Sequence, residues 1–325
     1  MSTRLALLAV PLALAFPSVS RAADAPVPKQ APTVVPTLPA VDPQMVSAAF
    51  GFRFVSDYNS RGISQTNRHP GAQGYLEFQM LDGLFYAGIA GEQVDLPNRP
   101  TMEMDFSAGI RPTFGAWSFD LGYLFYNYPG ERALIGPDGT IYTANNADYY
   151  EFVGKAAYAV NDALTLGLNV YHSPSYFGTH APGTYVSGVA KYTIPEGTFG
   201  VMPSGFLVSA EVGQYFLGTT RASFGVFKLP DYTYGNVGIA YTVKNFTIDL
   251  RYHNTSMTKS ECGLITADPR SILNGTFRSN WCGAAVVATV SVDVTSKDPG
   301  IFAGQETLAP SVPGRTSDAE GPAVR

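Results

Sequence analysis

Phe246-Thr247-Ile248-Asp249-Leu250-Arg251-Tyr252-His253 alternates apolar and polar side chains at every step. In an extended strand successive side chains point to opposite faces, so one face of this stretch is apolar and the other is polar. Twelve stretches of this kind lie between Val46 and Val294, and in each of them the charged residues fall in the polar phase. Because a charge on a lipid-facing position costs roughly 2–4 kcal/mol at mid-bilayer, this pattern predicts an all-β, transmembrane antiparallel barrel.

A soluble β-sandwich shows the same alternation with inside and outside exchanged, so alternation alone does not distinguish it from a membrane barrel. The N-terminal segment provides the distinguishing evidence. Residues 1–22 contain Arg4, an apolar run from Leu5 to Phe16 and the small-residue signature Ser20-Arg21-Ala22, which together predict a cleaved secretory signal peptide. No later segment has the roughly 18–20 consecutive apolar residues of a membrane-spanning helix, so an exported chain must enter a membrane as strands. We therefore expect the cell outer membrane of a Gram-negative bacterium.

The expected domains are a signal peptide (1–22), a Pro-rich periplasmic linker (23–45), the transmembrane barrel (46–294) and a disordered C-terminal tail (295–325). Short turns alternate with long loops, as in up-and-down outer-membrane barrels, and an even strand count leaves both termini in the periplasm. The last strand ends at Val294 without the terminal aromatic that the barrel-assembly machinery commonly reads. Strands are expected near 46–57, 72–81, 84–93, 102–112, 116–127, 149–159, 164–172, 184–194, 204–216, 232–243, 246–256 and 283–294.

Composition supports a barrel and excludes other classes. Only 14% of residues are charged, 13% are aromatic and 33 are Gly, which suits many strands joined by tight turns and flanked by aromatic belts. A net charge of −5 without a basic run argues against binding nucleic acid. No cofactor or metal site is expected, and the predicted partners are outer-membrane lipid, the assembly machinery and small polar solutes. The sequence is also compatible with a homo-oligomer.

Cys262 and Cys282 are the only cysteines, and both lie in the last long loop of an exported chain. Oxidising conditions outside the cytoplasm favour a disulfide between them. Zinc binding is the weaker alternative, because the histidines do not cluster near the cysteines in the sequence and two cysteines alone lack the spacing of a zinc site.

Three blocks of sequence carry a resemblance to a known family. The first contains Asp57, Tyr58, Arg61, Gly62, Ile63, Ser64 and Gln65; the second contains Asp120-Leu121-Gly122-Tyr123; the third contains Tyr171-His172-Ser173-Pro174. Over residues 50–178 the chain resembles the TorF-type family, whose members are proposed to be outer-membrane porins. The resemblance implies an outer-membrane barrel that passes small solutes, without naming the solute.

The alternation sends a set of charged residues into the lumen, with acids outnumbering bases. We expect a narrow porin for passive diffusion of small hydrophilic solutes or ions. Because rings of carboxylates favour cations, its lumen is expected to lean weakly towards cations or neutral solutes. The alternative is a closed structural or adhesive barrel, in which opposite charges bridge the lumen as buried pairs. Glu103, Asp105 and Arg111 are expected to cluster, with Asp120 beside them. The expected pore-lining residues are Arg53, Glu77, Glu92, Glu103, Asp105, Arg111, Asp120, Glu151, Lys155, Lys191, Glu211, Asp249 and Arg251.

Two further features leave alternatives open. Arg61 could fold inward to constrict the mouth, but we favour a tight turn at Arg61-Gly62 with the glycine at positive φ. Aromatic residues could stack sugars or nucleosides, but we favour an interfacial belt. The aromatic residues concerned are Trp117, Tyr123, Tyr128, Tyr150, Tyr232 and Tyr234.

An outer-membrane lipid hydrolase is the rival from another class. Such an enzyme needs a serine nucleophile beside a histidine base on the barrel wall. His253 is assigned to the lumen and His172 to a strand end, and no serine nucleophile is placed beside either. We therefore expect no enzymatic activity.

Overall fold

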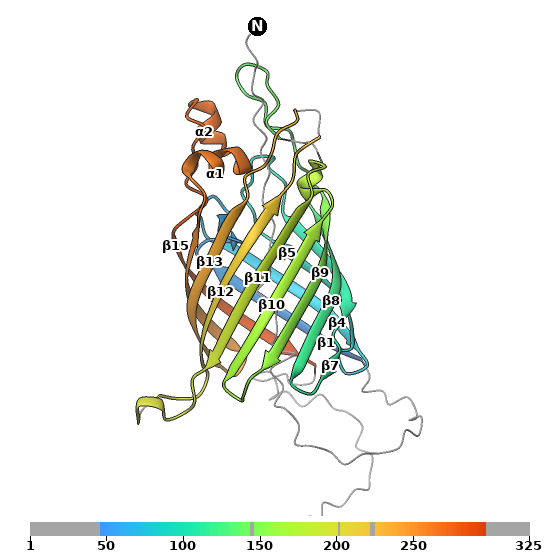
Figure 1. The fold of residues 1–325 in the computed structure, drawn as a ribbon, viewed down its shortest axis with the longest axis vertical. Coiled ribbons are helices and arrows are strands. Elements are labelled where there is room, and N and C mark those ends of the chain that lie inside the picture. Colours follow the sequence, from blue (N-terminus) through green and yellow to red (C-terminus); the bar gives the residue numbers. More distant parts are fainter. Residues whose placement is uncertain (1–45, 144–145, 201, 222–224, 297–325) are drawn as a thin grey trace, which may run out of the picture.

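The computed structural model describes residues 46–143, 146–200, 202–221 and 225–296. Twelve long antiparallel strands form a closed barrel, because the first, β1, pairs with the last, β15, and every other strand pairs with its neighbours along the chain (Figure 1). The predicted fold class is confirmed. The strands are β1 (Val46–Val55), β4 (Gly71–Met80), β5 (Phe85–Glu92), β6 (Glu103–Ile110), β8 (Trp117–Asn127), β9 (Tyr149–Ala159), β10 (Leu164–Ser173), β11 (Gly183–Thr193), β12 (Phe206–Leu217), β13 (Tyr232–Val243), β14 (Phe246–Thr255) and β15 (Ala285–Thr295).

The observed strand bounds lie within two residues of those predicted from the alternation. A two-residue strand, β7 (Thr113–Phe114), extends the pairing with β8 beyond the end of β6. The predicted signal peptide and Pro-rich linker lie outside the described residues. Of the predicted tail only Thr295 and Ser296 are described, and Thr295 still belongs to β15. None of the helices in the described ranges has the length and apolar character of a membrane-spanning helix.

The barrel wall has an apolar outer face and a polar inner face. On β14, Ile248 and Leu250 are 58% and 52% exposed, whereas the side chains of Asp249 and Arg251 are only about 20% exposed and bind each other. The same alternation runs along β1, where Phe50, Phe52 and Phe54 are exposed. A closed barrel with an apolar exterior and charged interior is the arrangement of a transmembrane β-barrel.

We expect Leu250→Arg to destabilise the folded barrel in lipid vesicles by about 2–4 kcal/mol, because it puts a cation among lipid tails. The measurement is urea unfolding of the refolded protein. Thr247→Arg, on the inner face of the same strand, is the control and is expected to cost less. Equal losses for the two variants would contradict a lipid-facing outer wall.

The two ends of the barrel differ. Short turns join strands at one end, whereas the opposite end carries helices α1 (Lys259–Thr266) and α2 (Pro269–Leu273), the 3-10 turn η3 (Tyr176–Gly178) and the long loops (Figure 1). A further 3-10 turn, η4 (Thr198–Gly200), lies in the connection between β11 and β12. The predicted disulfide between Cys262 and Cys282 is present and joins α1 to the segment before β15.

The main buried core lies inside the barrel at the long-loop end. Its aromatic residues come from strand ends and from the long loops, and we call them the mouth cluster. These residues are Tyr58, Tyr126, Tyr128, Tyr149, Tyr171, Tyr176, Phe177, Tyr185, Tyr215, Tyr232, Tyr234 and Trp281.

Candidate functional site

The first long loop folds into the mouth of the barrel as a small hairpin. Its strands β2 (Asn59–Ser60) and β3 (Ile63–Ser64) are joined by the two residues Arg61 and Gly62, whose φ angles are 43° and 87°. Positive φ at both central positions is the requirement of a type I′ hairpin turn. A Cβ on Gly62 would lie 2.0 Å from Thr255 Cγ2, so close packing also requires glycine here. We call residues 57–66 the plug segment.

Polar side chains of the plug segment and of Arg68, just after it, hold the segment in shape. The carboxylate of Asp57 accepts hydrogen bonds from the hydroxyls of Ser64 and Thr66 at 2.5 and 3.1 Å, and from the Arg68 guanidinium at 3.0 Å. The other residues of the family-like motif, Tyr58, Ile63 and Gln65, are at most 3% exposed. The motif therefore shapes the plug segment rather than a strand of the wall.

Arg61 points from the turn into the lumen and binds Glu151 on β9. Its two terminal nitrogens lie 2.7 and 2.8 Å from the two carboxylate oxygens, and both side chains are at most 1% exposed. Burial by itself lowers the pKa of Arg61, but the Glu151 carboxylate outweighs it, and the pKa lies well above its ordinary value. Arg61 therefore stays charged in a bidentate, buried ion pair.

Four tyrosines contact this ion pair. Tyr126 donates a hydrogen bond to Glu151 at 2.9 Å, and Arg61 donates one to Tyr215 at 3.0 Å. The guanidinium carbon of Arg61 also lies 4.5 Å from the ring centre of Tyr171 and 4.9 Å from that of Tyr185. The predicted tight turn with Gly62 at positive φ is confirmed, but the preference against an inward Arg61 was wrong, because the turn directs its side chain to a carboxylate across the lumen.

The aromatic-belt prediction was correct for part of its residues. Trp117 and Tyr123 are 48% and 40% exposed on the outer wall, and Tyr150 stacks on Tyr123. Tyr128, Tyr232 and Tyr234 are at most 4% exposed and belong to the mouth cluster, so their assignment to the belt was wrong. Their positions at strand ends match a belt in the sequence, but their alternation phase points them inward.

A second polar network lies deeper in the lumen. Arg111 binds Glu77 with a shortest distance of 2.7 Å, and Arg111 and Lys155 both lie 3.5 Å from a carboxylate oxygen of Asp120. These four side chains are 13–25% exposed. Tyr86 completes the network by donating a hydrogen bond to Asp120 at 2.8 Å.

The predicted cluster of Glu103, Asp105 and Arg111 does not form. Glu103 and Asp105 lie at the mouth end of β6, whereas Arg111 follows the other end of that strand and binds Glu77 and Asp120. Six residues of extended chain separate Asp105 from Arg111 by about 20 Å. Residues on one strand face share a direction but not a depth in the lumen, which is why this prediction was wrong.

The remaining expected lumen residues lie on the inner face of the wall. Glu211 accepts hydrogen bonds from Tyr185 and Asn236, at 2.8 and 3.1 Å. Arg251 binds Asp249 at 2.8 Å and also bonds Asn236. Arg53 and Lys191 are half-buried on inward positions of β1 and β11.

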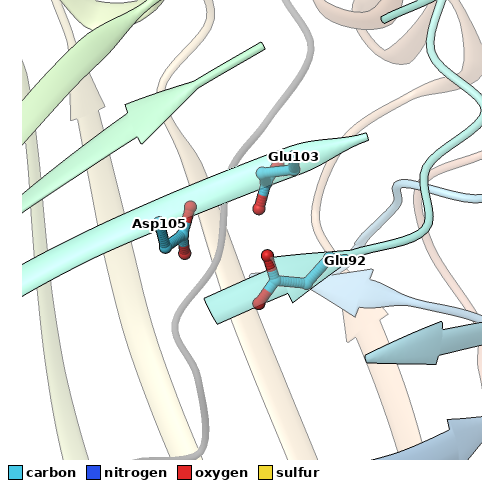
Figure 2. A group of neighbouring side chains, drawn as sticks. All are labelled: Glu92, Glu103 and Asp105. Atoms are coloured by element: carbon cyan, nitrogen blue, oxygen red, sulfur yellow. The ribbon is translucent and has the colours of Figure 1, made fainter. Parts of the chain in front are cut away.

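Three buried carboxylates form a cluster just inside the mouth. Glu92 ends β5, Glu103 begins β6, and Asp105 lies two residues further along β6; Figure 2 shows the three side chains turned toward one another. One oxygen from each lies within 4.8 Å of the others. The Tyr58 hydroxyl donates to Glu103 at 3.0 Å, and burial and then the Glu103 charge raise the pKa of Tyr58 well above its ordinary value. We call Glu92, Glu103 and Asp105 the carboxylate triad.

A cavity occupies the lumen below the mouth. Its lining includes Glu77, Asp105, Arg111, Asp120 and Lys155, so it is bordered by charged side chains of both signs. Asp105 connects this cavity to the carboxylate triad. The cavity and the mouth above it are the candidate site for passage of a polar solute.

His172 and His253 each lie beside a hydroxyl group of a neighbouring strand. His172 Nδ1 lies 2.9 Å from the Thr184 hydroxyl, and His253 Nδ1 lies 2.8 Å from the Tyr234 hydroxyl. In the ranges that the structure covers, neither histidine is hydrogen-bonded to a serine. Each of these two histidines therefore has a hydroxyl partner from a neighbouring strand, Thr184 or Tyr234.

A family model described as "Bacterial protein of unknown function (Gcw_chp)" matches residues 39–266. No curated protein matches the sequence. Among solved structures, a KdgM porin is similar with 10% identity and a TM-score of 0.41, over 76% of this chain and 97% of that one. A NanC porin is similar with 10% identity and a TM-score of 0.40, over 77% and 98%. OpdK of Pseudomonas aeruginosa, solved with vanillate, has 10% identity and a TM-score of 0.34, over 70% and 57%. At such TM-scores these likenesses add nothing to an inference of function.

Proposed function

This chain belongs to the Gcw_chp family of bacterial proteins of unknown function, and on that premise we propose that it is an outer-membrane porin whose mouth is closed by the plug segment. The solutes are small and hydrophilic, and they diffuse passively once the plug segment leaves the mouth. The observation that carries the proposal is the buried pair between Arg61 of the plug segment and Glu151 of the wall.

Several features support the outer membrane as the location. The barrel is closed, its outer wall carries exposed apolar side chains on strands around the circumference, and its charges face inward. These are the properties of outer-membrane barrels, which cross lipid with strands instead of helices. The predicted signal peptide and the resemblance to the TorF-type family agree with this location.

The partly exposed charges below the mouth support passage of polar solutes. Glu77, Arg111, Asp120 and Lys155 border the cavity and are less buried than the pair at the mouth. A polar, water-accessible lumen is what a porin requires, whereas the mouth cluster closes the path above it. The plug segment belongs to a loop and not to the barrel wall, so it can move without breaking the barrel.

We expect Arg61→Asn to open the mouth. Asparagine suits the first central position of a type I′ turn, so the variant keeps the hairpin while removing the guanidinium. Loss of about 1.4 kcal/mol of closing free energy corresponds to a tenfold change in the closed-to-open ratio. Single-channel recording in planar bilayers is expected to show rare openings for the wild type and an open fraction at least about tenfold higher for the variant.

Arg278→Asn is the matched control, because it removes an arginine from an exposed position in the last long loop. It is expected to conduct like the wild type. Silence from both the wild type and Arg61→Asn, with folded and inserted protein, would overturn the porin. Equally free conduction by both would overturn closure by the plug segment.

A closed structural barrel is the second candidate function, and the mouth cluster favours it. Tyr126, Tyr176, Tyr185 and Tyr215 are fully buried across the mouth and contact one another or their neighbours. This aromatic packing stabilises the closed end of the barrel in addition to the ion pair between Arg61 and Glu151. Conductance of Arg61→Asn separates the two candidates.

A further inference from the structure

The carboxylate triad is buried without the partners that three negative charges require. Glu92 and Glu103 are 0% exposed and Asp105 is 2% exposed. Within the part of the chain that the structure describes, neither carboxylate oxygen of Glu92 or of Asp105 has a hydrogen-bond partner, and one oxygen of Glu103 has none. Buried charges are ordinarily paired, hydrogen-bonded or bound to a metal, because burial without a partner is costly.

The neighbouring residues do not balance the charge of the triad. Glu92 pairs in register with Glu103 on one side and with Gln73 on the other, and Gln73 pairs with Arg53. Arg53 on β1 attracts Glu92 on β5 across Gln73 of the strand between them, and it offsets at most one of the three negative charges. The hydroxyls of Tyr58, which donates to Glu103, and of Tyr128, which also interacts with Glu103, are neutral. A charge of about −2 is left when all three carboxylates are ionised.

We propose that the carboxylate triad binds one hard divalent cation of the Ca²⁺ class inside the barrel mouth. Carboxylate oxygens are the ligands that such cations prefer. The free oxygens of Glu92 and Asp105 and the free oxygen of Glu103 are its ligands, and the cation satisfies the residual charge. The cation joins β5 to β6 beside Tyr58, and so stabilises the closed mouth. The site does not depend on whether the barrel conducts.

The spacing of the ligands fits a calcium ion. Ca²⁺ lies about 2.3–2.6 Å from its oxygen ligands, so two ligands on opposite sides are separated by about 4.6–5.2 Å. The triad oxygens all lie within 4.8 Å of one another, so one such ion can contact all three. Mg²⁺ requires nearly octahedral geometry at about 2.0–2.1 Å and usually keeps several waters. Asp105 also borders the lumen cavity, which provides a path by which the ion enters.

Terbium luminescence tests the site directly. Tb³⁺ is a probe for Ca²⁺ sites, and excitation of nearby tyrosines sensitises its emission; Tyr58 bonds the triad directly. Titration of the refolded full chain with TbCl₃ is expected to give saturable emission that CaCl₂ displaces. Glu92→Gln and Asp105→Asn are each expected to weaken binding by at least about tenfold, since even second-shell changes at metal sites typically cost 10–100-fold.

Asp249→Asn is the matched control, because it also removes one lumen carboxylate, but one that Arg251 already binds. It is expected to leave Tb³⁺ binding unchanged. Absence of saturable emission from folded wild type would overturn the proposal, as would equal loss of binding in Asp249→Asn and Asp105→Asn.

A stability comparison separates cation binding from protonation of the triad. In EDTA, Glu92→Gln is expected to unfold at a higher urea concentration than the wild type, because it removes one of three clustered charges. In CaCl₂ the order is expected to reverse, because only the wild type has all three ligands. An order that is the same in EDTA and CaCl₂ would overturn the proposal and assign shared protons to the triad.

Discussion

Glu151→Gln is expected to destabilise the folded protein by about 3–5 kcal/mol, which is the usual cost of removing one partner from a buried ion pair. The variant leaves the charged Arg61 side chain buried at the mouth without its carboxylate. Tyr126 and Tyr215 also lose the anion to which they bond. The measurement is urea unfolding in lipid vesicles, with linear extrapolation of the free energy of unfolding.

Glu77→Gln is the control for this prediction. It makes the same chemical change opposite another bidentate arginine, Arg111, but in the wetter part of the lumen, where the two side chains are 17% and 25% exposed. Because solvent screens a partly exposed pair, we expect a loss of about 1 kcal/mol or less. Losses of equal size would show that burial at the mouth does not govern the strength of the Arg61 pair.

The double variant Arg61→Asn/Glu151→Gln extends the same test. It removes both charges at once, so no uncompensated charge stays buried. We expect its cost to be clearly less than the sum of the two single costs, as for residues in direct contact. Additive costs would contradict a direct interaction between the two side chains.

Trp281→Ala is expected to cost about 3–5 kcal/mol, the usual range for a large aromatic residue removed from a core. Trp281 is 2% exposed in the mouth cluster, and its indole nitrogen donates to Asn67 at 2.9 Å. Its backbone carbonyl accepts a hydrogen bond from Ser64 of β3, so the last long loop holds the plug segment from the side. We also expect more frequent openings in single-channel recording, because the plug segment loses this support.

The chain offers a matched control in its other tryptophan. Trp117 lies on the outer wall, 48% exposed, where it stacks on Phe119. Trp117→Ala removes the same side chain without touching the mouth, so it is expected to be less destabilising and to leave conductance unchanged. If Trp117→Ala raised the open fraction as much as Trp281→Ala, the support of the plug segment by Trp281 would be wrong.

The sequence predicted the barrel wall well because its rule is local. A strand in lipid needs an apolar residue at every second position, and Phe246 to His253 satisfies that rule without reference to any other part of the chain. The disulfide was equally accessible, since Cys262 and Cys282 are the only cysteines of the sequence. The same local alternation along a strand predicted that Glu92, Glu103 and Asp105 point into the lumen.

The sequence did not predict which side chains fill the mouth of the barrel. The inward fold of Arg61 depends on Glu151, ninety positions away, and on aromatic residues from other strands. The signal that was present is the arginine at the first position of a type I′ turn, where asparagine or aspartate is usual. Tyr128, Tyr232 and Tyr234 were wrongly assigned to the aromatic belt, because a tyrosine at a strand end can lie either in the outer belt or inside the mouth.

The sequence by itself determined which side chains face lipid and which face the lumen, because alternation along one strand sets that direction. Only the tertiary structure decided which inward residues meet. Pairing of β5 with β6 brings Glu92 beside Glu103 through cross-strand register, whereas Arg111 lies at a different depth in the lumen from both. Register and depth arise from the pairing of all twelve strands together, and no single strand carries that information.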